Sequence, residues 1–517
     1  MQGLDIATIA NSSMELTLLV LIIGGLLTLI TGQRSEKVGQ LMAAISLAGA
    51  ILLNVILLIQ VQHGAFIFQS YVWLAIDTTP ILTLGFLADG LSVPVVLLIT
   101  GLGFFSTLFS FSYMKDLKNP GVYYSLLVWF IAAMVGVIYA TNLMQFFLFY
   151  ELMLIPAFIL VYLYGVSEDP EKRSRNALQF WVWTAVGGLI SLVAVFIIFS
   201  QTGTMEYVTQ TSPTTLAYLS TSGIATEVAK LIGLIFLLGF GIKLGLVPLH
   251  VWAPPVYGEA PMPVLVLLSG AMTKTAAYGV IRIVIPLFGT ALSAYSTGLM
   301  VISIITMFYG AMLAISQKDL KMMLAYSSIS QLGYLMLGYS SMTVIGVNGA
   351  AFQLINHGVL ASLMFFCAGA IKLRTGTMEF DKLGGLGPKM PYLATIAIIG
   401  SLALAGTPPL SAFAGEWMIF AGVAELAISS GVLALVALTV IAVVATGLTA
   451  AYYLWAVRRI FYGPVLQELE NVNDPPRMIL FIGVVLVLFV VVIGIYPWLL
   501  WRWVSPALDL ITGVLGG

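Results

Sequence analysis

Four ionisable side chains lie inside long apolar stretches of this sequence: Glu151, Lys243, Lys274 and Glu416. A charged group at the centre of a bilayer costs about 2.5–3.5 kcal/mol on insertion scales, and such groups usually mark a path for protons or ions. Burial lowers the pKa of a lysine towards neutrality, so that its amine can take up and release protons. We therefore predict that these four residues transfer protons. The alternative is a set of structural ion pairs that tie helices together.

Histidine, tyrosine and arginine side chains extend this set. A histidine can titrate near neutral pH, so His357 is predicted to join the proton relay. His250 is expected to act either as a relay residue or as a donor to a free backbone carbonyl. Lys274, Tyr278 and Arg282 recur every four residues, which places them on one face of a helix. Arg282 stays protonated, so we interpret it as a fixed charge.

Two amides and a tyrosine are predicted to support the path: Gln331, Tyr334 and Gln353. Gln353, Asn356 and His357 stand at i, i+3 and i+4, so they share a helix face. Hydrogen bonds that only hold neighbouring membrane helices together are the alternative for these amides.

The composition is that of a membrane protein. The chain has 517 residues, of which 60% are hydrophobic and 8% are charged, whereas about 25% of the residues of a soluble domain are charged. Lipids are therefore expected as partners. The net charge of −1 provides no basic surface for nucleic acid, which is not expected as a partner.

No cofactor is expected in this chain. Its single cysteine, Cys367, cannot form a disulfide within the chain or hold an iron–sulfur cluster alone. The three histidines, His63, His250 and His357, are far apart and show no metal-ligand spacing. The sequence has no phosphate-binding loop and no dinucleotide-binding glycine motif after a strand, which argues against ATP-driven pumping.

Membrane helices must position these groups, and a helix needs about 20 apolar residues to cross the hydrocarbon core. Apolar runs of that kind predict an all-α polytopic membrane protein with about 14 transmembrane helices. The predicted spans are 14–32, 38–62, 81–112, 122–140, 143–165, 176–200, 228–252, 262–286, 296–316, 320–340, 346–372, 391–424, 431–460 and 478–503. The run 81–112 is long, so it either tilts or begins outside the membrane.

The basic residues predict the orientation. Of the 21 Lys and Arg residues, sixteen lie in loops after odd-numbered spans and two, Lys230 and Arg502, lie on the other side. Lys243, Lys274 and Arg282 remain inside spans. Because cytoplasmic loops carry the excess of Lys and Arg, both termini are expected on the outer side.

Prolines interrupt two of the spans. Pro248 lies five residues after Lys243, and Pro408 and Pro409 lie shortly before Glu416. Proline inside a helix frees a carbonyl, and membrane helices tolerate this where water or another helix meets the freed group. We therefore predict that helices 7 and 12 are discontinuous.

Paired interrupted helices are typical of transporters built from repeats. The two breaks lie five helices apart, an odd number, so the repeats are expected to be inverted. We predict a single membrane domain, 1–517. Its parts are helices 1–3 (1–121), a first five-helix repeat of spans 4–8 (122–286), a second of spans 9–13 (294–460), and helix 14 (478–503).

The motifs resemble those of a known family. "FLFYELMLIPAFIL", "GIKLGLVPLHVWAPPVYGEAP", "GAMTKTAAYGVIR" and "GTPPLSAFAGEWMIF" are similar, in order, to segments of the antiporter-like membrane subunits of complex I. Glutamate on the twelfth span, here Glu416, and the absence of a long lateral helix are features of the subunit M or chain 4 branch. The sequence departs from the family at Gln331, where histidine is common. A proton crossing there would need water, Tyr334 or a serine hydroxyl.

The resemblance implies a proton-translocating subunit of a respiratory or photosynthetic complex I-type enzyme, an NADH (or ferredoxin or deazaflavin):quinone oxidoreductase. Redox catalysis, flavin, iron–sulfur clusters and quinone would belong to partner subunits. Those partners would be other membrane-arm subunits, including two further antiporter-like ones. The implied location is the inner (plasma) membrane or a thylakoid-type membrane.

The resemblance also suggests a mechanism, in which Glu151 and Lys243 form a switchable pair. When the pair separates, the proton of Lys243 passes to Lys274, and from there by His357 to Glu416. The alternatives are an Mrp-type sodium/proton antiporter subunit, an antiporter-like subunit of a membrane-bound hydrogenase, and a scaffold of the membrane arm that conducts no ions.

Overall fold

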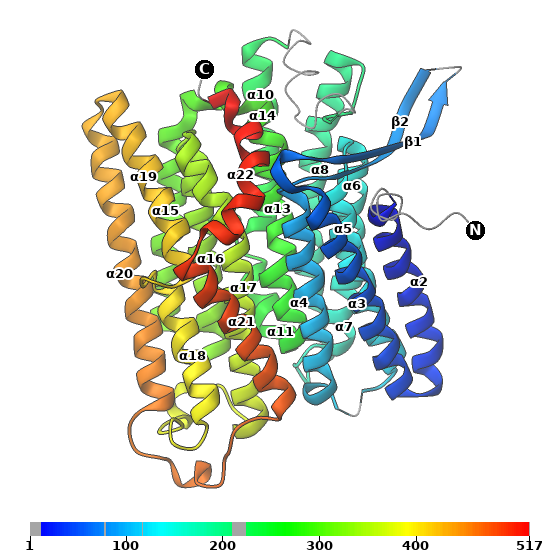
Figure 1. Cartoon of the computed structure of the whole chain (residues 1–517). Coiled ribbons are helices and arrows are strands. Elements are labelled where there is room, and N and C mark those ends of the chain that lie inside the picture. Colours follow the sequence, from blue (N-terminus) through cyan, green and yellow to red (C-terminus); the bar gives the residue numbers. More distant parts are fainter. Residues whose placement is uncertain (1–11, 77–78, 116, 209–223, 516–517) are drawn as a thin grey trace.

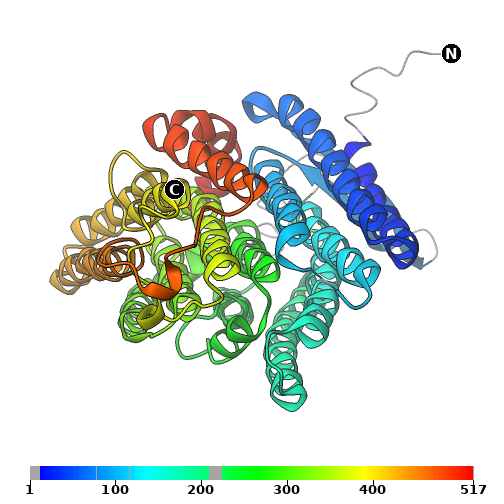
Figure 2. The ribbon, with the colours of Figure 1, turned by 90° about the horizontal axis from the view of Figure 1, so that it is seen from below.

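The computed structural model describes residues 12–76, 79–115, 117–208 and 224–515, and most of these residues form one bundle of helices (Figure 1). Eleven helices of this described part are long and apolar enough to cross a membrane. The prediction of an integral membrane protein is therefore confirmed. Viewed along the bundle, α2 and α3 lie at one end and α20 lies at the other (Figure 2).

The first third of the chain contains two long helices, a hairpin and four further helices. These elements are α2 (Ser13–Arg34), α3 (Glu36–Gln60), η1 (Gln62–Gly64), β1 (Ile67–Ile76), β2 (Thr79–Ala88), α4 (Ser92–Tyr113), α5 (Pro120–Tyr139), α6 (Leu143–Leu152) and α7 (Leu154–Tyr164).

The middle of the chain holds the longest helices and two π-helical turns, η2 and η3. These elements are α8 (Pro170–Thr202), α10 (Thr226–Leu244), α11 (Ala253–Glu259), α12 (Met262–Leu267), η2 (Leu268–Met272), α13 (Thr273–Gly279), η3 (Val280–Val284), α14 (Ile285–Leu292), η4 (Ser293–Tyr295), α15 (Ser296–Ser316), α16 (Leu320–Ser340) and α17 (Val344–Thr375).

The last part of the chain completes the bundle and ends in a short amphipathic helix. These elements are η5 (Phe380–Lys382), α18 (Pro391–Leu404), α19 (Ser411–Ser430), α20 (Leu433–Phe461), η6 (Gln467–Leu469), α21 (Arg477–Ile495), α22 (Trp498–Thr512) and η7 (Gly513–Leu515).

The all-α prediction is wrong in one place, because β1 and β2 form an antiparallel hairpin across the upper end of the bundle in Figure 1. The predicted span 81–112 therefore starts as a strand, and its helix begins only at Ser92. The carboxylate of Asp89 accepts the backbone N–H groups of Leu91 (3.0 Å) and Ser92 (2.7 Å). Such a carboxylate satisfies donors that a helix start leaves free.

Two other predicted spans are divided. The span 143–165 is interrupted at Met153, because Pro156 has no N–H to donate to the carbonyl four residues earlier. The span 478–503 is two helices, since α21 ends before Pro497 and α22 starts after it. By contrast, the breaks predicted at Pro248 and at Pro408 and Pro409 are confirmed, because they separate α10 from α11 and α18 from α19.

A five-residue turn occurs twice in the structure. Thr-Gly-Thr-Met-Glu follows α8 at 202–206 and follows α17 at 375–379. In both copies the glycine has a positive φ, 71° and 75°, and the methionine carbonyl accepts the first N–H of another helix. These bonds are Leu143 N–H to Met205 O (2.8 Å) at α6 and Leu320 N–H to Met378 O (2.9 Å) at α16. The two helix pairs α6–α8 and α16–α17 are thus joined in the same way.

The hairpin is fastened to the bundle by Glu206, which lies in the first of these turns. Its carboxylate accepts hydrogen bonds from Thr83 Oγ1 on β2 and from Asn142 Nδ2 (2.9 Å) at the start of α6. Burial raises the pKa of Glu206, while these two bonds oppose that shift.

The N-terminal helices pack through glycines. A methyl group on Gly32 of α2 would lie 2.4 Å from the Cα of Gly121 on α5, so backbone would have to move.

We expect Gly32→Ala to lower the thermal midpoint of the purified protein. Gly447→Ala on α20 is the matched control, because no atom lies within 4 Å of the added methyl and alanine favours the helix by about 1 kcal/mol. Equal midpoints for both variants, measured by heating and size-exclusion chromatography, would contradict this packing.

Candidate functional site

The break after α10 leaves backbone N–H and C=O groups without partners in the helix, and side chains form hydrogen bonds with them. Trp252 Nε1 donates to the carbonyl of Ile242 (2.6 Å), and the N–H of Val247 donates to Thr306 Oγ1 (3.1 Å). Lys243 lies in the last turn of α10, directly before the break. A helix C-terminus carries partial negative charge, so it stabilises an ammonium group there.

Lys243 is fully buried and contacts Tyr150. Its Nζ donates to the backbone carbonyl of Tyr150 (3.0 Å) and lies 3.3 Å from the centre of the Tyr150 ring. A cation over an aromatic face is stabilised by the ring quadrupole, the more so when water is excluded. Tyr150 therefore holds the ammonium group through two different interactions, although the sequence analysis did not select it.

Glu151 follows Tyr150 but turns to another helix. A methyl group on Gly188 of α8 would lie 1.8 Å from Glu151 Oε1, so the carboxylate rests directly against that glycine. Within the described residues, Oε1 has no hydrogen-bond partner and no ion pair joins Glu151 to Lys243 within 4.0 Å. The predicted pair thus makes no direct ion pair in this structure, and Tyr150 contacts Lys243 instead.

Lys274 and His357 are in direct contact. Nζ of Lys274 lies 2.8 Å from Nδ1 of His357, and both side chains are buried. Lys274 also donates to the carbonyl of Ser269 (2.8 Å). The π-helical turns η2 and η3 lie immediately before and after α13, which carries Lys274. Such π-helical turns are frequent at functional sites.

Amide groups continue from His357 towards Glu416. Gln353, one turn before His357 on α17, donates from Nε2 to Oε1 of Gln331 (3.4 Å). Gln331 in turn interacts with the carboxyl group of Glu416. We call Lys274, His357, Gln353, Gln331 and Glu416 the central row; all five are buried.

The second break brings Glu416 close to backbone. A methyl group on Gly406, which has φ +70°, would lie 2.5 Å from Glu416 Oε2. The same break receives Asn356, whose Nδ2 donates to the carbonyl of Ser411 (3.0 Å). This bond agrees with the helix-joining alternative for Asn356.

Three buried oxygens beside the central row lack a hydrogen-bond partner within the described part of the chain. They are Gln353 Oε1, Asn356 Oδ1 and Ser411 Oγ. Buried polar atoms of proteins are nearly always bonded to protein or to ordered water. The segment between His357 and Glu416 therefore has the polar surface that internal water requires.

The remaining predicted residues lie around the row. Tyr278 donates to the carbonyl of Ile138 (3.0 Å), and Tyr334 lies 3.3 Å from Thr449 Oγ1. His250 is apart from the row, with Nε2 3.2 Å from the hydroxyl of Tyr309 on α15. His250 thus neither contacts Lys274 nor bonds a carbonyl of the break.

Arg282 forms a buried ion pair that the sequence analysis missed. One guanidinium nitrogen lies 2.7 Å from Asp89 Oδ2, and both side chains are almost fully buried. The pair joins η3 to the end of the hairpin, so Arg282 is a fixed, neutralised charge. Asp89 was detectable in the sequence, because it was the only acid within the predicted span 81–112.

Lys321, a second cation that the sequence did not single out, lies at the C-terminal end of α11. Lys321 was counted as a loop residue, yet it is buried and its Nζ donates to the carbonyls of Gly258 (2.7 Å) and Ala260 (2.8 Å). It neutralises the C-terminal end of α11 and ties that helix to α16.

The family of the chain follows from comparison with known proteins. A family model described as "NADH:quinone oxidoreductase/Mrp antiporter, TM" matches residues 140–442. The chain belongs to this family. A second model, "NADH-Ubiquinone oxidoreductase (complex I), chain 5 N-terminus", matches residues 73–124.

Similar proteins carry subunit M and chain 4 names. NADH-quinone oxidoreductase subunit M of Pseudomonas aeruginosa is 34% identical over 443 residues, 83% of this chain and 81% of that protein. NAD(P)H-quinone oxidoreductase chain 4 3 of Trichormus variabilis is 34% identical over 414 residues, 79% of this chain and 74% of that protein. The structure is similar to a chain of respiratory complex I from Thermus thermophilus, with a TM-score of 0.83 and 27% identity, over 98% of this chain and all of that one. The family predicted from the motifs is confirmed.

Glycine at position 406 is predicted to be necessary for the position of Glu416. Gly406→Ala places a methyl group against the carboxylate and should lower the number of protons moved per electron by the assembled complex in liposomes. Gly431→Ala is the control, since Gly431 also has a positive φ (+65°) but no atom within 4 Å of the added methyl. Both variants carry left-handed strain of roughly 1–2 kcal/mol, so only contact with Glu416 separates them. The same stoichiometry in both would refute the role of this contact.

Proposed function

We propose that this chain moves protons outward across the membrane as a subunit of a complex I-type enzyme. The observation that carries the proposal is the buried contact between Lys274 and His357, which starts a row of polar groups ending at Glu416 beside a helix break. An uncompensated lysine–histidine contact deep in a membrane is unfavourable when both groups are charged. Such a contact suits a site where one proton is passed between two bases.

The first half of the path would use Glu151, Tyr150 and Lys243. Lys243 is held by the carbonyl and ring of Tyr150, while Glu151 lies against Gly188. We interpret this arrangement as the separated state of the predicted switch. Movement of Glu151 towards Lys243 would stabilise the ammonium form, and its withdrawal would release the proton towards Lys274.

The second half would use the central row and water. Glutamine cannot titrate, so Gln353 and Gln331 can orient a chain of water molecules but cannot carry the proton themselves. The unpartnered oxygens of Gln353, Asn356 and Ser411 supply acceptors for that water. Glu416, next to the break at Gly406, would be the terminal acceptor.

The fold supports two inverted repeats, 122–286 and 294–460, within fourteen membrane spans. The two Thr-Gly-Thr-Met-Glu turns make matching hydrogen bonds to α6 and to α16, and each half contains one broken helix. With the predicted number of membrane crossings between them, the two turns would lie at opposite ends of the bundle. Together with the cytoplasmic excess of Lys and Arg, we infer that both termini lie on the outer side of an inner (plasma) or thylakoid-type membrane.

The partners would be the other membrane-arm subunits, including two further antiporter-like ones. NADH, ferredoxin or deazaflavin would deliver electrons to flavin, iron–sulfur clusters and quinone held by other chains. An Mrp-type sodium/proton antiporter, a hydrogenase-type subunit and a scaffold that conducts no ions are the alternatives. Sodium-dependent transport by the reconstituted complex would favour the first, and unaltered proton movement in Lys243→Ala or Glu416→Ala complexes would favour the last.

Glu151→Gln should abolish most coupled proton movement while the complex still assembles, because glutamine keeps the size of the side chain and removes its charge. Glu425→Gln is the control, since Glu425 is an exposed acid near the C-terminal end of the Glu416 helix. The measurement is the proton-to-electron ratio in liposomes. An unchanged proton-to-electron ratio for Glu151→Gln would contradict the proposed switch.

His357→Gln should likewise lower the ratio strongly, because the amide can hydrogen-bond Lys274 but cannot accept its proton. His250→Gln is the matched buried control and should keep most of the activity, since His250 lies against Tyr309 on α15. Equal losses in the two variants would mean that the contact with Lys274 has no special part in transfer.

A further inference from the structure

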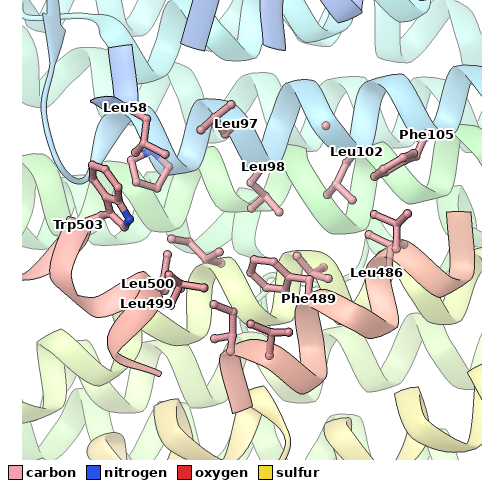
Figure 3. A pocket seen from close by; sticks show the side chains of 17 residues that line it. Leu58, Leu97, Leu98, Leu102, Phe105, Leu486, Phe489, Leu499, Leu500 and Trp503 are labelled. Carbon is pink, nitrogen blue, oxygen red and sulfur yellow. The ribbon is translucent and has the colours of Figure 1, made fainter. Parts of the chain in front are cut away.

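A large apolar pocket, which no residue of the central row lines, lies between α4, α17, α21 and α22 (Figure 3). Its volume is about 370 Å³. Figure 3 shows Leu97, Leu98, Leu102 and Phe105 of α4 facing Phe489 of α21 across it. None of the described residues that line the pocket is charged, so the pocket suits a hydrocarbon ligand.

A lipid acyl chain has the chemistry that this lining suits, because it is apolar along its whole length and the bilayer supplies it. An apolar helix of a partner subunit is the other occupant of that chemistry, and cross-linking distinguishes the two.

One end of the pocket meets a cation. Trp503 of α22 lines the pocket, and the guanidinium carbon of its neighbour Arg502 lies 5.2 Å from the centre of the Trp503 ring. Arg502 is exposed and forms no ion pair within the described residues. Trp498 and Trp501 lie on the same helix, and tryptophans gather where hydrocarbon meets head groups.

We propose that this pocket binds a phospholipid, with one acyl chain between α4 and α21 and the phosphate at Arg502. Hydrocarbon gains little by moving from the bilayer to an apolar slot, because lipid tails are as apolar as leucine. Specificity therefore comes from the head group, where the guanidinium binds phosphate oxygens by charge-assisted hydrogen bonds. The site is distinct from the proton path and does not depend on the proposed function.

Gly101 on α4 offers a direct test. It lines the pocket, and no atom lies within 4 Å of a methyl group added to it. Gly101→Leu thus fills the slot without forcing backbone apart. Gly447→Leu is the matched control, because a methyl group added at Gly447 also meets no atom within 4 Å and Gly447 does not line the pocket.

The assembled complex is stripped of lipid in detergent, reloaded with dioleoylphosphatidylglycerol or dioleoylphosphatidylcholine, and weighed by native mass spectrometry. Wild type and Gly447→Leu should retain one more phosphatidylglycerol than Gly101→Leu. Arg502→Gln, a surface change that leaves the fold intact, should reduce the preference for phosphatidylglycerol by about fivefold. Equal retention by Gly101→Leu and wild type would overturn the acyl-chain site, and an unchanged preference in Arg502→Gln would overturn the phosphate contact. Cross-linking of Gly101→Cys to a partner subunit would show that protein covers the pocket instead.

Discussion

The structure depends on holding cations inside a membrane, where water cannot solvate their charge. Lys243, Lys274, Arg282 and Lys321 are all buried, yet only Arg282 has an acidic partner within 4.0 Å among the described residues. The three lysines are held by backbone carbonyls instead, at Tyr150, at Ser269, and at Gly258 and Ala260. A carbonyl carries only a partial charge, so it stabilises an ammonium group without fixing its protonation state as a carboxylate would.

Interrupted helices follow from the same constraint. A regular helix uses its carbonyls internally, so it has few to offer a side chain. The carbonyl that binds Lys243 lies beside the interruption at Met153, and the two that bind Lys321 lie at the end of the short helix α11. The prolines of this chain thus do more than bend helices. They create the local backbone ends that bind Lys243 and Lys321, whereas Lys274 and Arg282 lie on one run of helix and are held by the carbonyl of Ser269 and by Asp89.

Much of this arrangement was predictable from the sequence, because charge and proline stand out against apolar runs. Lys274, His357 and Glu416 and both major breaks were found that way. The hairpin was missed because its strands are apolar and continue directly into α4, so run length alone could not separate them. Tyr150 was missed because an aromatic residue beside an acid has no pattern of its own; only the fold brings Lys243 over its ring. The repeated Thr-Gly-Thr-Met-Glu turn was visible in the sequence, but both copies and their glutamates lie outside the predicted spans, where a search for ionisable groups in the membrane does not look.

Gln331 is where the chemistry of the row changes. In the proposed path, a proton would pass from nitrogen to nitrogen over the 2.8 Å between Lys274 and His357, whereas Gln353 and Gln331 have no proton to exchange at physiological pH. An amide between His357 and Glu416 would not insulate them, because its oxygen and nitrogen can order water. Such a segment would conduct only when it is hydrated. Control of hydration between α17 and the break at Gly406 would therefore regulate transfer as effectively as a change in the charge of Lys243.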